Sequence, residues 1–312
     1  MTRSSPGQDV DPDVKISVVI PTYNSFRFLK ESIDSVLAQE YPAHEIIVVD
    51  GASTDGTKEL CGSYGERIRF IQQASNEGVG SALNVGVRAM TGNWFKEHDA
   101  DDVLAPNALQ VLARAATVTP AQVVYGDFTN VDSRGRNPRV ARMITPDEAE
   151  DFVVASWRIL VVSHMSAMVR RTCFDAVGLY DDTLESAEDY DWFLRAVMVH
   201  GVRFYHVPVV LARYRKHRAQ TTHWRRKGRI VSSTRRRTEE KVRSLIAAQA
   251  DERAFAYYTG LTRRFRRIYA PILRLIGVLP PLPRRDTAGY FLSRLVPRTY
   301  NRLYWALNPP VP

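Results

Sequence analysis

The feature that most constrains the fold is an alternation of short apolar runs with segments of helical periodicity over residues 15–105. The β-branched runs Lys15–Pro21 and Glu45–Asp50 are typical of strands buried on both faces. Between them, apolar residues recur about every 3.6 positions after Ser25, which we expect to cap that helix. This repeated order of strand and helix predicts an α/β fold with a Rossmann-like, mostly parallel sheet flanked by helices.

Further elements follow from the same kinds of signal. A turn at 132–136 leads into more antiparallel structure. The other expected strands span 67–72, 93–98, 123–128 and 163–169, and the other expected helices span 78–90, 106–118 and 147–154, with one more from 188 onward. Ligands of such sheets bind beyond the carboxyl ends of the strands, where segments 21–24, 50–51 and 99–102 fall together.

Three carboxylates crowd into four residues at the end of the fourth expected strand: Asp99, Asp101 and Asp102. Like charges this close are costly unless a cation lies among them, and carboxylate oxygens are the ligands that Mg²⁺ and Mn²⁺ prefer. The run therefore predicts a divalent metal site. A solvated acidic turn is the competing interpretation.

Charge is divided unevenly along the chain. Residues 1–212 hold 19 Lys and Arg against 29 Asp and Glu, whereas residues 213–312 hold 24 against 5, so the net charges are −10 and +19 within a total of +9. Such an asymmetry suggests an acidic, metal-assisted front part and a rear part that meets an anionic surface or ligand.

The 312 residues, 45% of them hydrophobic, are enough for one large domain or two ordinary ones. Residues 1–14 are polar and are expected to be disordered, without a signal peptide, and no apolar stretch reaches the length of a spanning helix. Cys61 and Cys173 lack the spacing of a disulfide framework or a zinc site. We therefore expect a cytoplasmic protein.

Five segments together resemble the family 2 glycosyltransferases, which have the GT-A fold. Their order and spacing match that family: Val18–Asn24, Val48–Thr57, Asn76–Gly78 with Ala82–Gly86, the DXD-containing His98–Asp102, and Glu188–Trp192. The resemblance covers 15–218, with a nucleotide-sugar donor half at 15–105 and an acceptor half at 106–218. It implies a hexosyltransferase-type enzyme of polysaccharide biosynthesis that moves a sugar from a nucleoside-diphosphate sugar to a hydroxyl of a glycan or lipid-linked acceptor, by metal-assisted inverting displacement.

The resemblance also implies roles for residues of the donor half. Pro21, Tyr23 and Asn24 would line the nucleotide pocket, and Asp50 would hydrogen-bond the base, unless it only caps a helix. Asp99 would contact the ribose or a water molecule of the metal.

A second set of implied roles concerns the metal and the diphosphate. Asp101 would ligate the Mn²⁺ or Mg²⁺ that neutralises the departing diphosphate. His217 would complete the metal shell or hold the diphosphate, although a solvent-facing histidine is the alternative. Arg215 could pair with phosphate.

On the acceptor side, the resemblance makes Asp189 the base that takes the proton from the acceptor hydroxyl, with Glu188 orienting it. Asp191 competes, because side chains two residues apart on a helix point about 200° apart and only one of them can face the cleft. His164 would shape the acceptor pocket. Trp192 either stacks on the acceptor or packs in the core.

Two departures from the family pattern are visible. Lys96–His98 is polar where relatives are apolar, so we expect this strand to be partly exposed or to end in a loop. Leu83–Asn84 replaces an Arg-Asn pair, which puts a phosphate contact at that position in doubt.

The rear segment, 219–312, alternates arginine clusters with aromatic and aliphatic residues, as at Arg263–Arg267. We expect a mainly helical extension that lies in a membrane interface against anionic lipids, as a peripheral protein on the inner face of the cell membrane. The alternative is packing on the catalytic domain or on a dimer partner. No nucleic-acid motif accompanies the charge, so we expect no nucleic-acid partner.

Two rival functions are weighed against transfer of a sugar. A nucleotidyltransferase of similar sheet type would want a Gly-rich, basic loop after the first strand, which Pro21–Asn24 does not supply. An inactive membrane-associated scaffold would be expected to have lost Asp101 or Asp189, and both are present. The sequence leaves the donor, the acceptor and the pathway open.

Overall fold

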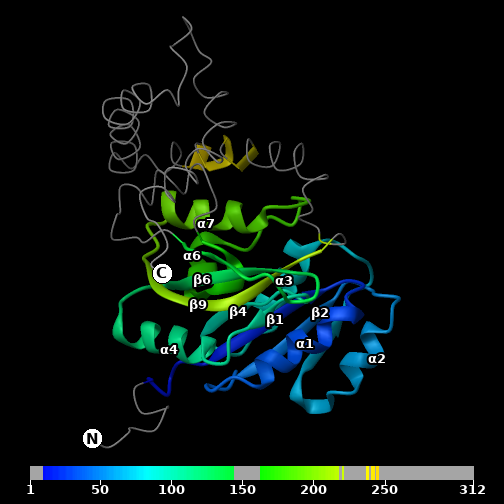
Figure 1. The fold of residues 1–312 in the computed structure, drawn as a ribbon. Helices are drawn as coiled ribbons and strands as arrows, with labels where there is room; N and C mark the ends of the chain where they lie inside the picture. Colours follow the sequence, from blue (N-terminus) through cyan, green and yellow to red (C-terminus); the bar gives the residue numbers. More distant parts are fainter. Residues whose placement is uncertain are drawn as a thin grey trace, which may run out of the picture.

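The computed structural model describes residues 10–143, 162–217, 220 and 237–245 apart from 239 and 243. These residues form one mixed sheet of nine strands with helices packed against it (Figure 1). The strand order is β3-β2-β1-β4-β8-β6-β9-β5, and β7 pairs with β6. This architecture confirms the expected α/β class.

The donor half supplies parallel strands, because β2, β1 and β4 lie side by side with β3 at the edge, and β6 and β9 form a further parallel pair. Its elements are β1 (Ile16–Thr22), α1 (Phe26–Leu37), β2 (Glu45–Asp50), α2 (Thr57–Gly62), a 3-10 turn (Gly65–Arg67), β3 (Arg69–Gln72), α3 (Val79–Ala89) and β4 (Trp94–Glu97).

The acceptor half continues the sheet with antiparallel pairs on both sides of β8, which joins β4 to β6. Its elements are β5 (Val103–Leu104), α4 (Ala108–Val118), β6 (Val123–Asp132), β7 (Arg139–Ala141), a 3-10 turn (His164–Ser166), β8 (Ala167–Arg170), α6 (Thr172–Val177), α7 (Glu188–Met198) and β9 (Phe204–Lys216). The helix expected at 147–154 lies outside the described residues.

Each face of the sheet is covered by its own hydrophobic core. Ile16, Val18 and Ile20 of β1 pack with α1 and α4, whereas Val19 of the same strand packs with α3, α6 and α7. Alternate residues of a strand point to opposite faces, so β1 needs apolar residues on both faces, and its buried polar residues are Ser17 and Thr22. The expectation of a strand buried on both faces is confirmed.

Ser25 is at the N-cap position of α1, as expected, but its side chain does not cap the helix. The side chain of Ser25 makes no capping hydrogen bond, and the first helical amide, that of Phe26, donates to Asp55 Oδ2 at 2.9 Å. Asp55 lies in the loop after β2, and it reaches α1 only because parallel strands bring their carboxyl ends together. The cap is therefore tertiary rather than local.

Of the two alternatives for Lys96–His98, partial exposure is wrong, whereas a loop holds for His98, which follows the end of β4 at Glu97. Lys96 and His98 are 0% exposed and Glu97 is 4% exposed. β4 is a central strand between β1 and β8, so its polar side chains cannot reach solvent. In the part of the chain that the structure describes, no helix is long and apolar enough to cross a bilayer.

Candidate active site

The loops after β1 and β2 hold each other at the carboxyl edge of the sheet. The amide of Asn24 donates to Ser53 Oγ at 2.8 Å, and the amide of Thr54 donates to Asn24 Oδ1 at 2.9 Å. Asn24 adopts a left-handed backbone conformation with φ 49°, which asparagine tolerates well. Beside it, Tyr23 is half exposed, and Pro21 is buried near the end of β1, so the three residues expected to bind nucleotide lie at the end of β1 and in the loop after it.

Asp50 lies beneath this loop and is fully buried. Its carboxylate accepts hydrogen bonds from the Ser53 hydroxyl at 2.5 Å and the Ser53 amide at 3.0 Å, and a longer one from Gln72 Nε2 at 3.4 Å. These contacts order the turn that follows β2. Binding of a nucleotide base by Asp50 stays a prediction. A bound base would have to share the Asp50 carboxylate oxygens with Ser53.

The segment after β4 is tied to the end of β9. His217 Nε2 and Asp101 Oδ2 are 2.7 Å apart, so the two side chains expected to hold a metal form a hydrogen-bonded pair. The Phe28 ring packs on His217, with 4.7 Å between ring centroids. The Arg215 amide donates to Asp102 Oδ1 at 2.9 Å.

Arg215 is buried and has several protein partners. Its guanidinium donates to the Asp101 carbonyl at 2.9 Å, to Glu31 at 2.5 Å and to the Ser133 carbonyl at 3.4 Å. It also lies 5.0 Å from the Phe28 ring centroid, within cation–π range. A phosphate at Arg215 would replace the Glu31 carboxylate, which is more than half exposed.

Asp101 and His217 provide one oxygen and one nitrogen ligand. No cluster of three or more His, Cys, Asp or Glu side chains is arranged as a metal shell among the described residues. The pair nevertheless fits a divalent cation that keeps water or substrate oxygens as its other ligands. Burial first, and then the neighbouring carboxylates, raise the pKa of both Asp99 and Asp102 well above the usual range, and a cation would relieve this crowding.

A second group of charged side chains is buried around the end of β4. The Glu97 carboxylate contacts His164 Nδ1, and the Lys96 ammonium donates to the carbonyls of Met165, at 2.9 Å, and of Glu97. Burial lowers the pKa of Lys96 to about 8 and that of His98 to about 3. Tyr180 OH is 3.5 Å from His164 Nε2, so the chain of polar contacts continues to the loop before α7.

This buried group faces the first turn of α7. Burial and the negative charge of Asp189 raise the pKa values of Glu97 and Glu188 to about 8. Burial lowers the pKa of His164 to about 4, against the attraction of Asp189 and Glu188. Glu97, His164, Glu188 and Asp189 therefore form one acidic cluster, which together with Tyr180 we call the base site.

Asp189 and Asp191, the two candidates for the base, differ in burial and in their hydrogen-bond partners. Asp191 is fully buried and accepts a hydrogen bond from Arg195 Nε at 2.8 Å, so it serves the packing of α7. Asp189 is partly exposed and lies in the first turn, next to the base site. The residue before this turn, Ala187, has φ 65°, an unfavourable conformation for alanine that marks the junction as constrained.

Stacking of an acceptor on Trp192 is wrong. Trp192 is 0% exposed, packs among Phe174, Tyr180 and Phe193, and donates from Nε1 to the Gly178 carbonyl at 2.9 Å. The core-packing alternative holds. His164, expected to shape the acceptor pocket, is at the base site but is itself almost fully buried.

Sequence reasoning missed two members of the base site, Glu97 and Tyr180. The signal for Glu97 was available, because a charged residue in a strand between two motifs needs a buried partner. No local signal marks Tyr180, whose place is fixed by Asn84 from α3: Asn84 Nδ2 donates to the Tyr180 carbonyl, and Asn84 Oδ1 accepts from its amide, both at 3.0 Å.

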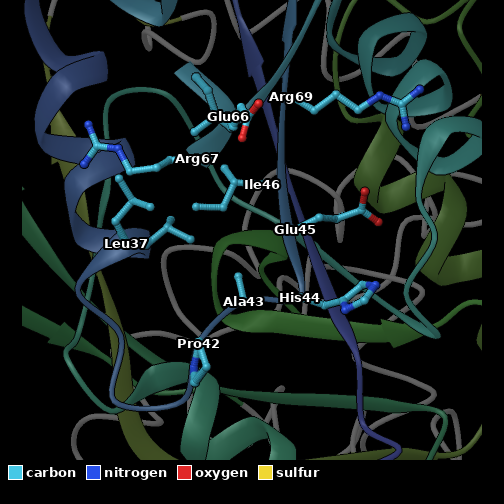
Figure 2. A pocket seen from close by; sticks show the side chains of 11 residues that line it. Leu37, Pro42, Ala43, His44, Glu45, Ile46, Glu66, Arg67 and Arg69 are labelled. Carbon is cyan, nitrogen blue, oxygen red and sulfur yellow. The ribbon is translucent and has the colours of Figure 1, made fainter. Parts of the chain in front are cut away.

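A pocket of about 270 Å³ lies at the opposite edge of the sheet. Figure 2 shows that its lining includes Glu45 and Arg69, the residues at which β2 and β3 begin. Ligands of parallel sheets bind beyond the strands' carboxyl ends, so this pocket is not the candidate active site.

Comparisons with known proteins agree with this geometry. The model of glycosyl transferase family 2 matches residues 17–178. An uncharacterized glycosyltransferase of Rickettsia prowazekii is 32% identical over 214 residues, and this match spans 66% of the present chain and 65% of the relative's length. The succinoglycan biosynthesis protein ExoO of Rhizobium meliloti is 35% identical over 136 residues, which span 43% of the chain and 38% of ExoO.

The fold has solved counterparts as well. Residues 1–349 of S. aureus TarS, solved with UDP-GlcNAc, superpose with a TM-score of 0.62 at 19% identity, over 81% of this chain and 73% of that one. At this identity the likeness shows the fold alone, which is GT-A. The family model spans just over half of the chain and includes the acidic run after β4, and on that basis the chain belongs to glycosyl transferase family 2.

Proposed function

We propose that the protein transfers a sugar from a nucleoside-diphosphate sugar to a hydroxyl group of a glycan or lipid-linked acceptor, with inversion at the anomeric carbon. The observation that carries this proposal is the meeting of two acidic segments at one sheet edge. The segment after β4 brings Asp101 to His217, and the first turn of α7 brings Asp189 to the base site. One segment suits a leaving diphosphate and the other suits an attacking hydroxyl.

Solved neighbours indicate which donors to test first. TarS has been solved with UDP and with UDP-GlcNAc, and GalNAc-T7 with UDP, GalNAc and Mn²⁺ at a TM-score of 0.54 and 16% identity. We therefore extend the proposal to a uridine-diphosphate sugar as donor. The Tyr23–Asn24 loop, with Asp50 beneath it, would hold the nucleoside.

In the proposed reaction, Asp189 accepts the proton of the acceptor hydroxyl as that oxygen forms a bond to the anomeric carbon. The bond between the anomeric carbon and the diphosphate oxygen breaks at the same time, and the electron pair leaves with the nucleoside diphosphate. Asp101 and His217 would hold the Mn²⁺ or Mg²⁺. A bound divalent cation supplies neutralisation of the charge that develops on the diphosphate. Glu188 and the Glu97–His164 pair orient Asp189 and the acceptor.

The direct test measures donor hydrolysis and transfer with UDP-, GDP- and dTDP-sugars in Mn²⁺, for the wild type and Asp101→Asn. We expect turnover of one donor, and a loss of about 100-fold or more in the variant because charge stabilisation at the leaving group is lost. Asp34→Asn, which changes an exposed ion pair with Lys30 and a hydrogen bond from Tyr64, is the matched control and should leave turnover unchanged. Failure to turn over any donor, or an unaffected Asp101→Asn, contradicts the proposal.

The membrane association proposed for the basic region needs a separate test. Residues 237–245 belong to this region and pack on α7, so a chain that ends at 245 keeps this contact (Figure 1). We expect the full chain to float with vesicles of anionic lipid, and the chain that ends at 245 to bind them less. Equal binding by both would exclude residues 246–312 as the membrane contact.

A further inference from the structure

A short helical segment of the basic region lies against α7, on the side away from the sheet (Figure 1). We call residues 237–242 the clasp, leaving aside 239, which the structure does not describe. Thr238 Oγ1 donates to Asp191 Oδ1 at 3.2 Å, and Lys241 Nζ lies 3.4 Å from both Asp191 oxygens. Val242 is fully buried against Tyr190 and Leu194. The contact is therefore both polar and apolar.

The clasp also holds the loop that leads into α7. Lys241 Nζ donates to Asp181 Oδ2 at 2.9 Å, and Arg237 donates to the Thr183 hydroxyl at 2.9 Å. Burial raises the pKa of Asp181, but hydrogen bonds from Thr183 and the Lys241 ammonium outweigh it and bring the pKa to about 2. Lys241 thus bridges two carboxylates, one on α7 and one on the loop before it.

The same loop is fixed from its other side by the donor half. Asn84 of α3 holds the backbone of Tyr180 through two hydrogen bonds of 3.0 Å. A Cβ placed on Gly80 would lie 3.4 Å from Asp182 Cα, so α3 and the loop are in close backbone contact. The segment from Tyr180 to Ala187 therefore contacts α3 on one side and the clasp on the other. It ends at Ala187, whose backbone conformation is constrained and which directly precedes Glu188 and Asp189.

We propose that the clasp positions the first turn of α7, and that Lys241 is a positioning residue for Asp189. The inference rests on the proposed function, because it assigns Asp189 the role of base. Buried Asp191 pairs with Arg195, and Lys241 adds a second cation that also reaches Asp181. Loss of Lys241 would free the loop on one side and let Asp189 move relative to Glu97 and His164. A shift of this kind lowers the rate of the chemical step more than the affinity for the donor.

The experiment compares full-length Lys241→Met with the wild type in two assays. Hydrogen exchange of the α7 amides, which needs no substrate, should become faster over the first turn in the variant. With the donor that the wild type uses, kcat should fall about 10-fold while KM for the donor changes less than about 2-fold. Lys241→Arg keeps the cation and should restore most of kcat. The midpoint of thermal unfolding is measured for each variant, to confirm that each is folded.

The matched control is Lys30→Met, which removes the same side chain from an exposed pair with Asp34 on α1. It should change neither exchange of α7 nor kcat. Unchanged exchange of α7 in Lys241→Met overturns the proposal, and so does an equal loss of kcat in Lys241→Arg. If the wild type turns over no donor, the proposed function fails on its own, and hydrogen exchange alone then decides whether the clasp holds α7.

Discussion

The donor half and the acceptor half place their charged side chains in different ways. In the donor half, neighbouring loops hold each other through contacts about 30 residues apart or closer, such as Asn24 with Thr54 and Asp50 with Ser53. At the base site and along α7, which the acceptor half supplies, the partners are distant and include residues outside that half: Glu97 meets His164, and Asp191 meets Lys241. The difference teaches that the nucleotide side of the site is built from local motifs, whereas the base site depends on how distant elements pack.

The largest expected effect tests whether the acceptor half supplies the base. Asp189→Asn keeps the size of the side chain but cannot accept the proton, so we expect kcat to fall by about 10²- to 10⁴-fold. Binding of UDP by the donor half should be unchanged. Kinetics combined with calorimetry of UDP binding measure both quantities. A variant that loses UDP binding and activity together would show that the two halves are not separable in this way.

The next effect tests whether the acceptor half is stabilised by buried charge. Asp191→Asn removes the buried carboxylate that Arg195 and Lys241 share, and we expect the free energy of unfolding to fall by about 3–5 kcal/mol. Urea denaturation measures this loss. Combining Asp191→Asn with Lys241→Met should cost less than the two single changes added together, because the variants share one interaction. Additive losses would mean that the two groups are independent.

The corresponding test in the donor half concerns shape rather than charge. A Cβ on Gly86 of α3 would collide with the Val19 side chain of β1, so Gly86→Ala should cost about 1–3 kcal/mol of unfolding free energy. Gly62→Ala is the matched control, because a Cβ there meets nothing within 4 Å. Equal stability of Gly86→Ala and the wild type would show that this interface is looser than the structure indicates.

The smallest effect is a dependence on pH. Burial raises the pKa of Glu97 from 4.5 to about 8, so the folded protein binds more protons than the unfolded chain, and stability falls as pH rises from about 4.5 to about 8. His164, with its pKa lowered from 6.5 to about 4, has the opposite effect, but only below pH 6.5. Between pH 6.5 and 8 His164 no longer contributes, and Lys96, with its pKa lowered from 10.5 to about 8, opposes the carboxyl groups mainly near the upper end of the interval.

Glu97→Gln should remove one of the two glutamate contributions in this interval, because Glu188 acts with the same sign. Between pH 6.5 and 8 the variant should gain at most about 2 kcal/mol of unfolding free energy relative to the wild type. Urea denaturation with a chelator present measures it without divalent cations. A difference that does not change with pH would show that Glu97 is already ionised at pH 6.5.

The sequence predicted the donor half well, because strand periodicity and loop motifs are local properties. The strands containing Val19 and Val48 and the helix at Glu188 lie where they were expected. The Ser25 side chain was expected to cap the helix, but the Phe26 amide donates to Asp55 instead. Asp55 is near this amide only because of the tertiary fold, which the local sequence does not show. The burial of Lys96 could not be read from its neighbours, because its partner is the carbonyl of Met165, 69 residues away.

The base site was predictable only in part, for the same reason. Helical geometry showed that Asp189 and Asp191 point in different directions, but not which of them faces the cleft. The answer depends on Lys241, 50 residues beyond Asp191 and within a segment whose charge suggested a membrane. Trp192 was expected either to stack on the acceptor or to pack in the core. It packs in the core, because aromatic residues of α6 and α7 enclose it. Assignment of the catalytic roles themselves stays a prediction that the proposed experiments address.

The tie between Asp102 and Arg215 has a consequence for engineering. These residues are 113 positions apart, yet the Asp102 carboxylate accepts a hydrogen bond of 2.9 Å from the Arg215 amide. The two ends of the stretch between them are therefore adjacent in space, at one place beside the donor half. A replacement taken from a relative would therefore need no new linker. Acceptor specificity could be exchanged as one cassette, provided that the new stretch keeps the pairing of β8 with β4 and the contact of Tyr180 with Asn84.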